Sequence, residues 1–222
     1  MFRKCCTSVL WLVFITLVPS QLSGQRKDSW GLEFIEERPN AIETTLDLTP
    51  DSLISVKESM LIEFDLSILN NRNYGNIAFL HDDKNQFECN LVYYHHSNKD
   101  TSFLQLNVNK SPSKIIFPIA KGNLHRGNWM SIQLYFDFAS HLISGTLNDT
   151  FLVKDTMRFP SVSRLAVQFG GYEQERDTPP MAIRDVRIIK DQPISSHHYD
   201  HRWKLNEADG EAANDEAEKS IA

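Results

Sequence analysis

Apolar and polar residues alternate with a period of two along much of this chain. In residues 60–69 an apolar set occupies every second position, with Glu63, Asp65 and Ser67 between its members, which are Met60, Ile62, Phe64, Leu66 and Ile68. This period is that of a β-strand with one face in a core and the other in water. Three further segments show it, namely 87–93, 104–108 and 130–138. Shorter candidate strands are 42–48, 77–80, 114–117 and 165–169.

Clusters of turn-forming residues separate these segments. They are rich in Asn, Asp and Gly, which tolerate turn conformations that other residues resist, and they lie at 70–76, 81–85, 97–100 and 121–123. No helical periodicity of useful length lies between the strands before residue 195. Many short strands joined by such turns predict an all-β fold, either a sandwich or a jelly roll.

The last strongly apolar segment, residues 181–189, departs from strict alternation. Its apolar residues fall at Ile183, Val186 and Ile188, which is a slip of one position. A β-bulge absorbs one extra residue and re-aims the side chains that follow it. We therefore predict a bulge near Arg184 and Asp185.

The N-terminus has the layout of a secretory signal peptide. Arg3 and Lys4 precede an apolar run at residues 9–18, and small residues follow up to Gly24. The run is about ten residues, whereas a membrane-spanning helix needs about 20. We expect cleavage of residues 1–24, a mature chain without a transmembrane segment, and a secreted or cell-envelope location, extracellular or periplasmic.

Cleavage would leave Cys89 as the only cysteine, so the mature chain could form no internal disulfide. Cys89 shares its alternating face with Phe87 and Leu91. A free thiol in such a position behaves as a small apolar side chain, and we predict that Cys89 lies in the core. Activation as a nucleophile would need a partner such as His95 or His96.

The formal net charge is −6. A mildly acidic chain lacks the basic surface that binds phosphate backbones, so nucleic acid is a poor candidate partner. The roughly 200 residues that follow the signal peptide suit one large β domain.

Three segments together carry a resemblance to a known family. They are the alternating strand led by Trp129 and ending at Asp137, the hairpin strand 145–149 and the late strand 181–189. Over residues 28–190 the chain resembles a laminin-G-like domain of the concanavalin A-like lectin/glucanase superfamily, of a bacterial secreted type. The resemblance implies a jelly-roll sandwich of two antiparallel sheets. It also implies that the Trp-led strand pairs with the hairpin strand, and that the late strand closes its sheet near the N-terminal strand.

The same resemblance bears on function. It implies a non-catalytic binding module for a glycan or a cell-surface protein, with calcium held in some members by acidic and carbonyl groups on rim loops. Asp185 is the candidate metal ligand, and a structural Asp bonded to nearby backbone is the other interpretation. Residues 191–222 would form a linker or the start of a further module in cis.

A glycoside hydrolase of the same superfamily is the alternative function, and a structural adaptor domain is another. A retaining hydrolase needs two carboxylates about 5 Å apart. The segment 207–211 has suitably spaced acids, but its intervening residues are Ala and Gly and it follows the last strand. Glu63 and Asp65 are also two residues apart, and a solvated strand face explains them equally well.

Histidines form another cluster, at His197, His198 and His201. His197 and His201 would share one face of a helix, as paired metal ligands do, whereas a His-rich surface linker is the simpler interpretation. His95 and His96 are adjacent in a strand and must point to opposite faces.

Glycan binding requires aromatic side chains beside a few hydrogen-bonding groups. Tyr94 and Tyr135 lie on the faces opposite the main apolar sets of their strands, and Trp129 is expected in the core. The loop 170–180 is long for a sandwich, and long loops often carry function. The predicted ligand-binding residues are Tyr94, Tyr135, Gln133, Asn90 and Tyr172. A groove lined by both Tyr94 and Tyr135 would indicate glycan binding, and a plain amphipathic sheet face is the competing interpretation.

Overall fold

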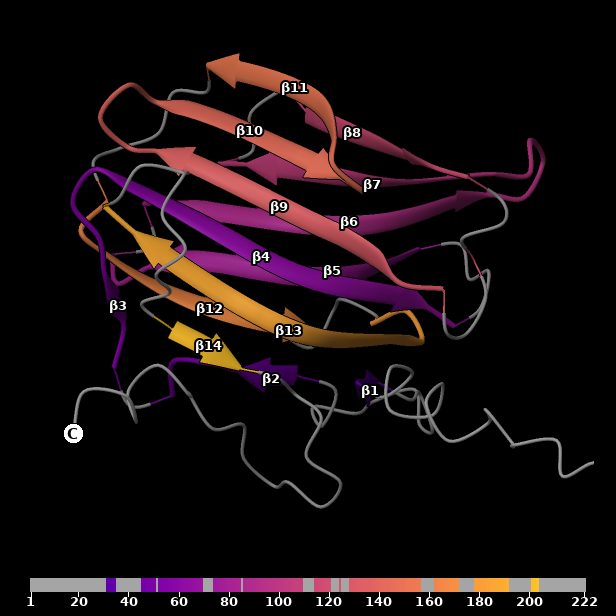
Figure 1. Cartoon of the computed structure of the whole chain (residues 1–222), viewed down its shortest axis with the longest axis horizontal. Helices are drawn as coiled ribbons and strands as arrows, with labels where there is room; N and C mark the ends of the chain where they lie inside the picture. The colour runs from indigo at the N-terminus through magenta and orange to yellow at the C-terminus, as the bar shows by residue number, and fades with distance from the viewer. Residues whose placement is uncertain are drawn as a thin grey trace, which may run out of the picture.

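The computed structural model of the chain is an all-β sandwich in which two sheets lie face to face (Figure 1). It describes residues 31–34, 45–50, 52–69, 74–84, 86–109, 114–120, 124, 128–156, 162–171, 178–191 and 201–203. All strand pairs in this part of the chain are antiparallel. None of these residues belongs to a helix with the length and hydropathy needed to cross a membrane.

Sheet A has seven strands in the order β1, β13, β4, β9, β10 and β11, and β14 also pairs with β13. Their bounds are β1 Leu32–Phe34, β4 Ser59–Ile68, β9 Met130–Asp137, β10 Leu142–Leu147, β11 Thr150–Thr156, β13 Met181–Lys190 and β14 His201–Trp203. This sheet faces the viewer in Figure 1.

Sheet B has seven strands in the order β2, β12, β5, β6, β7 and β8, and β3 also pairs with β12. Their bounds are β2 Thr45–Asp47, β3 Ile54–Ser55, β5 Tyr74–Asp82, β6 Glu88–His96, β7 Thr101–Val108, β8 Lys114–Ile119 and β12 Arg164–Gly170. Sheet B lies behind sheet A in Figure 1, and β8 approaches β11 where the two sheets come together at one edge.

The two pairings that the resemblance implied are both present. The Trp-led strand β9 pairs with the hairpin strand β10, and the late strand β13 pairs with the N-terminal strand β1. One boundary differs from the sequence prediction, which ended the domain at Lys190. Residues 201–203 form β14 and pair with Val186, Arg187 and Ile188 of β13, so sheet A extends beyond that boundary.

The core lies between the inner faces of the two sheets. Phe64 of β4 and Phe169 of β12 meet edge to face across it, with ring centroids 5.0 Å apart. Cys89 of β6 is fully buried in the same cluster, as predicted. Burial raises the pKa of its thiol well above the ordinary value, so Cys89 remains protonated and unreactive at neutral pH.

The predicted bulge in the late strand is confirmed. The register between β13 and β4 shifts between Arg184 and Arg187, and Asp185 adopts a left-handed conformation with φ 54°. Ile183, Val186 and Ile188 consequently all reach the core. The bulge therefore accounts for the one-position shift of the apolar residues in the sequence.

Further local predictions differ from the structure. Tyr74, Gly75 and Asn76 belong to β5 instead of a turn, since a bulge between Asn76 and Ala78 lets the strand continue. Strand β11 was not predicted at all. The signal for it is the Asn148–Asp149 turn followed by Thr-Phe-Leu-Val, a run of residues that favour strands.

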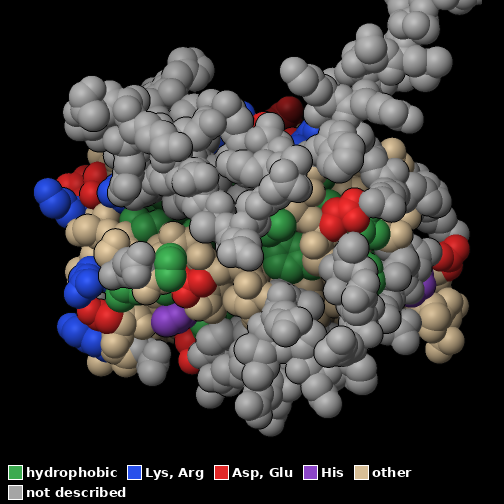
Figure 2. Space-filling model, turned by 90° about the horizontal axis from the view of Figure 1, so that it is seen from below, with side chains coloured by type: hydrophobic (Ala, Val, Ile, Leu, Met, Phe, Trp, Pro, Cys, Tyr) green, Lys and Arg blue, Asp and Glu red, His purple; other side chains and the backbone are tan. Residues whose placement is uncertain are grey.

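Charged side chains of both signs are interleaved on the surface. Seen from below, Lys and Arg side chains stand beside Asp and Glu side chains at one end of the molecule (Figure 2). No large basic patch shows among the described residues on this face, which agrees with the acidic net charge of −6.

Candidate functional site

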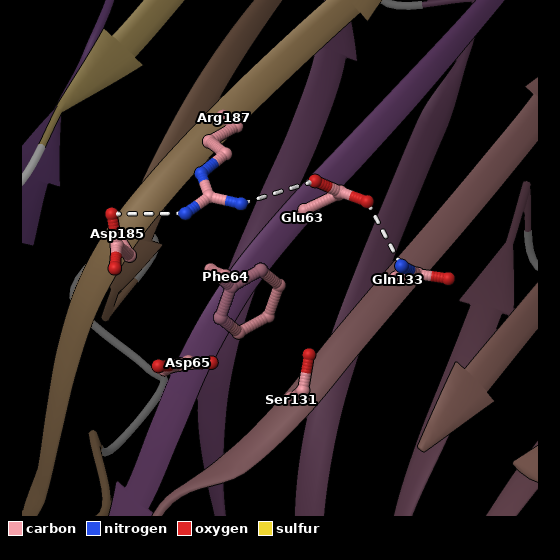
Figure 3. A pocket seen from close by; sticks show the side chains of 7 residues that line it. All are labelled: Glu63, Phe64, Asp65, Ser131, Gln133, Asp185 and Arg187. Atoms are coloured by element: carbon pink, nitrogen blue, oxygen red, sulfur yellow. Dashed lines mark hydrogen bonds and ion pairs between the residues drawn. The ribbon is translucent and has the colours of Figure 1, made fainter. Parts of the chain in front are cut away.

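The outer face of sheet A carries a polar depression of about 360 Å³ that is open to solvent (Figure 3). It lies over β4, β9 and β13, beside the bulge of β13 between Arg184 and Arg187. The residues that line it are Glu63, Phe64, Asp65, Ser131, Gln133, Asp185 and Arg187.

A chain of polar contacts crosses this depression. Thr146 Oγ1 donates to Gln133 Oε1 at 3.0 Å, and Gln133 Nε2 donates to Glu63 Oε1 at 2.9 Å. Arg187 lies between two carboxylates, 3.8 Å from Glu63 and 3.4 Å from Asp185. Figure 3 shows the guanidinium with a carboxylate on either side. Gln133 therefore belongs to a fixed network, which limits its freedom to bind a ligand.

The bulge also decides where the two arginines of β13 point. Arg184 lies opposite Asp65, and Arg187 lies opposite Glu63, so that both face outward although they are three positions apart. Arg184 Nε donates to Asp65 Oδ2 at 3.1 Å. Each arginine thus has a carboxylate partner on β4.

Trp129 was predicted to lie in the core, and this prediction is wrong. Trp129 is half-buried on the outer side of sheet A, where the Arg184 guanidinium covers its ring at 4.2 Å from the centroid. The reason is alternation, because Met130 is the first inward residue of β9 and Trp129 precedes it.

The predicted metal ligand Asp185 has a cationic neighbour in the structure. Its carboxylate contacts Arg187, and within the described ranges no group of three His, Cys, Asp or Glu side chains is placed to hold a metal ion. The structure therefore gives no support to calcium at Asp185. It places this residue at the bulge as a partner of Arg187.

The carboxylates of the depression are poorly placed for glycoside hydrolysis. A glycosidase needs one carboxyl kept as a proton donor and a second carboxylate with a different role. Glu63, Asp65 and Asp185 each lie beside a guanidinium, so none is set apart in apolar surroundings as that donor. An ionic network that ties β4 to β13 accounts for the arrangement.

The outer face of sheet B has a different character. Tyr74, Tyr94 and Phe103 face each other across β5, β6 and β7 and form what we term the aromatic row. The Tyr74 and Tyr94 ring centroids are 5.1 Å apart at an interplanar angle of 63°. Those of Tyr94 and Phe103 are 5.3 Å apart and nearly parallel at 18°. Tyr74 is 37% exposed, and it is one of the most exposed large apolar side chains among the described residues.

Two further rows run parallel to the aromatic row. The middle row consists of Asn76, Val92 and Gln105, which are buried, and the asparagine row consists of Phe79, Asn90 and Asn107. Asn90 and Asn107 are half-buried. The face thus combines aromatic rings with carboxamide groups.

The structure divides the predicted ligand-binding residues between two surfaces. Tyr94 and Asn90 lie on the outer face of sheet B, whereas Tyr135 and Gln133 lie on the outer face of sheet A. Both tyrosines point away from the core, as predicted. The idea of one groove lined by Tyr94 and Tyr135 is wrong, because the whole sandwich separates them.

Several other predicted positions can be placed only in part. Tyr172 lies outside the described residues, as do His197, His198 and the acidic segment 207–211. His201 lies in β14, so the helical arrangement considered for it is wrong. His95 and His96 point to opposite faces, as predicted. His95 Nδ1 lies 2.9 Å from Ser102 Oγ, and the His96 ring contacts Phe103 on the outer side.

The sequence prediction missed most of the sheet-B surface. Tyr74 was assigned to a turn. In β7 only the inward set at 104, 106 and 108 was used, although Phe103, Gln105 and Asn107 alternate with that set. The rule that selected Tyr94 would have found these residues had it been applied to β7.

Comparison with known proteins gives a likeness of fold. No family model matches the sequence, and no curated protein matches it. Among solved structures, a heptameric SAP-like pentraxin from Limulus polyphemus is 17% identical with a TM-score of 0.47, covering 68% of this chain and 72% of the pentraxin. An alginate lyase from Pseudomonas aeruginosa is 14% identical with a TM-score of 0.47, covering 67% of this chain and 74% of the lyase.

Domains LG4-5 of the mouse laminin alpha1 chain are also similar, with 14% identity, a TM-score of 0.44, and coverage of 78% of this chain and 50% of the laminin chain. At these identities the likeness concerns the fold alone.

Proposed function

We propose that this chain is a secreted, non-catalytic binding module that recognises a glycan through the outer face of sheet B. The observation that carries the proposal is the aromatic row beside the middle and asparagine rows. Sugar rings have apolar C–H faces edged by hydroxyls, so a site for them combines aromatic contact with a few hydrogen-bonding groups. Tyr94, Phe103 and Asn90 offer that combination on adjacent strands.

The geometry of the aromatic row favours binding in a further way. Tyr94 and Phe103 support each other at 5.3 Å, and Tyr74 contacts Tyr94 from the next strand. Side chains held in this way lose little conformational freedom when a ligand arrives, and pre-ordered groups improve affinity. The stack therefore acts as a rigid apolar ridge beside the carboxamides.

A glycan array probed with residues 25–222, with and without calcium, tests the proposal. We expect binding to a restricted set of glycans, and Tyr94→Ala should weaken it at least tenfold. Tyr135→Ala is the matched control, because Tyr135 is also a half-buried strand tyrosine but lies on the opposite face. Loss of binding in Tyr135→Ala alone would place the site on sheet A. An absence of binding to every glycan would overturn the proposal and direct the search to surface proteins.

The glycoside hydrolase alternative rests on the carboxylates of the sheet-A depression. Its test is release of reducing ends from soluble polysaccharides by the wild-type protein and by Glu63→Gln. We expect no release from either. Release that disappears in Glu63→Gln would establish the hydrolase and make the depression its active site.

A further inference from the structure

Two tripeptides of this chain have the form Asn-X-Ser/Thr, with X other than proline. They are Asn109-Lys110-Ser111 and Asn148-Asp149-Thr150. In a protein that enters a secretory compartment, this tripeptide is the acceptor for N-linked glycosylation, and the modified asparagine lies at the surface because the glycan is bulky. The N-terminal segment predicts such entry. The surroundings of the two asparagines therefore decide which of them can carry a glycan.

The second tripeptide lies at the tip of the β10–β11 hairpin, at the edge of sheet A (Figure 1). Asn148, Asp149 and Thr150 are all exposed. The backbone N–H of Asn148 donates to the Ser131 carbonyl at 2.9 Å, and Asn148 Oδ1 accepts from the Ser131 N–H at 2.9 Å. These two bonds hold Asn148 against the start of β9.

The bond from Ser131 also assigns the two atoms of the Asn148 amide. An N–H group needs an acceptor, so the atom beside Ser131 is Oδ1 and the remaining atom is Nδ2. Nδ2 makes no hydrogen bond with any described residue. N-linked attachment replaces one hydrogen of Nδ2 and leaves the carboxamide oxygen unchanged. A glycan at Asn148 is therefore compatible with the bond that holds the hairpin.

Asn109, in the first tripeptide, is half-buried and uses both atoms of its amide. Its Nδ2 donates to the Gln86 carbonyl at 3.0 Å, and its Oδ1 accepts from the Glu88 N–H at 2.6 Å. The backbone N–H of Asn109 also donates to the Glu88 carbonyl at 2.8 Å. A sugar at Nδ2 would crowd the Gln86 carbonyl and disturb this set of bonds.

We propose that Asn148 is N-glycosylated and that Asn109 is not; the inference shares with the proposed function only the secretion of the chain. The co-reactant is an oligosaccharide linked through a diphosphate to a lipid. Nδ2 forms a bond to the anomeric carbon of the first sugar, the bond from that carbon to the diphosphate oxygen breaks, and the lipid diphosphate leaves with the electron pair. The amide nitrogen gives up one proton to a base of the transferase, so no oxidant or reductant is needed.

Expression of the full chain in cultured animal cells tests the inference. We expect the mass of the secreted protein to fall on treatment with an amidase that cleaves the bond between asparagine and sugar. Peptide mass spectrometry should then show conversion of Asn148 to an aspartate.

Three variants identify the site. Asn148→Gln and Thr150→Ala should both lose the glycan completely, and Asn109→Gln should keep it. Thr150→Ala is the sharper variant, because it retains Asn148 and its bond from Ser131 and removes only the hydroxyl that the acceptor tripeptide requires.

Glu216→Thr is a matched control for the host cell, because it creates a second copy of the same tripeptide at Asn214-Asp215. A glycan at Asn214 in this variant with none at Asn148 would overturn the inference and leave the proposed function standing. A glycan at Asn109 would overturn the selectivity between the two asparagines. No glycan at either Asn148 or Asn214 would overturn the inference together with the secreted location of the proposed function, whereas glycan recognition by sheet B is tested separately on the array.

Discussion

The guanidinium of Arg184 lies over the indole ring of Trp129, with Cζ 4.2 Å from the ring centroid. Arg184 belongs to β13, and Trp129 directly precedes β9. Strand β4 lies between them in sheet A and supplies Asp65, to which Arg184 donates. One side chain thus links three neighbouring strands on the outer face.

Replacement of Arg184 by Ala should lower the free energy of unfolding by about 1 kcal/mol, because it removes a cation–π contact and a partly exposed ion pair, each worth up to about 1 kcal/mol. Urea denaturation followed by circular dichroism measures the change. Arg184→Lys is the control. Lysine keeps the positive charge but loses the planar stacking on the indole ring. The free energy of unfolding of Arg184→Lys should therefore lie between those of the wild type and Arg184→Ala. An Ala variant as stable as the wild type would contradict this role.

The sequence predicted the inner faces well because a single physical demand shapes them. Every second residue of a strand must be apolar to enter the core, and the slip at Ile183 and Val186 therefore revealed the bulge before the structure did. Pairing of β9 with β10 was also predictable, since the two strands are adjacent in the sequence.

The outer faces were not predictable in the same way. Alternation says that Tyr94 and Tyr135 point outward, but it does not say from which sheet, and they lie on opposite sides of the sandwich. The outward environment of the Trp129 ring depends on its contact with Arg184, which is far away in the sequence. A binding surface is determined by contacts between strands that are distant in the sequence. The residue pattern within one strand does not reveal these contacts.

Gly145 of β10 is expected to tolerate no side chain. A Cβ atom there would lie 2.7 Å from Cζ of Phe117, a buried ring of β8. Gly145→Ala should therefore lower the free energy of unfolding by about 1–3 kcal/mol, as overpacked cores do. Thermal unfolding provides the measurement. Adding Phe117→Leu should recover part of the loss, and strictly additive effects would show that the two positions are uncoupled.

The turn between β10 and β11 offers a matched pair of glycine substitutions. Asn148 and Asp149 have φ values of 50° and 60°, and Asn148 Oδ1 also accepts from the Ser131 N–H at 2.9 Å. Asp149→Gly should raise stability by about 0.5 kcal/mol, because glycine adopts positive φ without strain. Asn148→Gly should lower it by about 1 kcal/mol through loss of the hydrogen bond. Differential scanning calorimetry would detect the opposite signs, and equal shifts would contradict the role of Asn148.

Asp185 can be tested as a bulge residue and as a metal ligand together. Because its φ is 54°, Asp185→Gly should remain close to the wild type in stability, whereas Asp185→Val should lose about 1–2 kcal/mol. Melting curves of the wild type in calcium and in EDTA should coincide. A rise in melting temperature with calcium that is absent from Asp185→Gly would restore Asp185 as a ligand.

Asp191 makes the fold sensitive to acid at the end of β13. Its carboxylate accepts from the backbone N–H of Lys57 at 2.9 Å, of Glu58 at 2.6 Å and of Ser59 at 3.2 Å. Burial acts to raise the pKa of Asp191, but these donors together with the charge of Lys57 outweigh it and hold the pKa below its ordinary value. The charged form is therefore more favourable in the folded chain than in the unfolded one.

A pKa lowered by folding stabilises the protein above the unfolded value of about 3.9, and this stabilisation is lost as the pH falls through the folded value. Asp191→Asn should consequently be less stable than the wild type at pH 7 by about 1 kcal/mol, a magnitude reduced by solvent screening. The difference should shrink as the pH is lowered from about 5 toward 2. Urea denaturation of both proteins across this range measures it, and because every other carboxylate is common to the two, subtraction isolates Asp191. A difference that stays constant with pH would show that packing of the side chain, and not its charge, joins β13 to the start of β4.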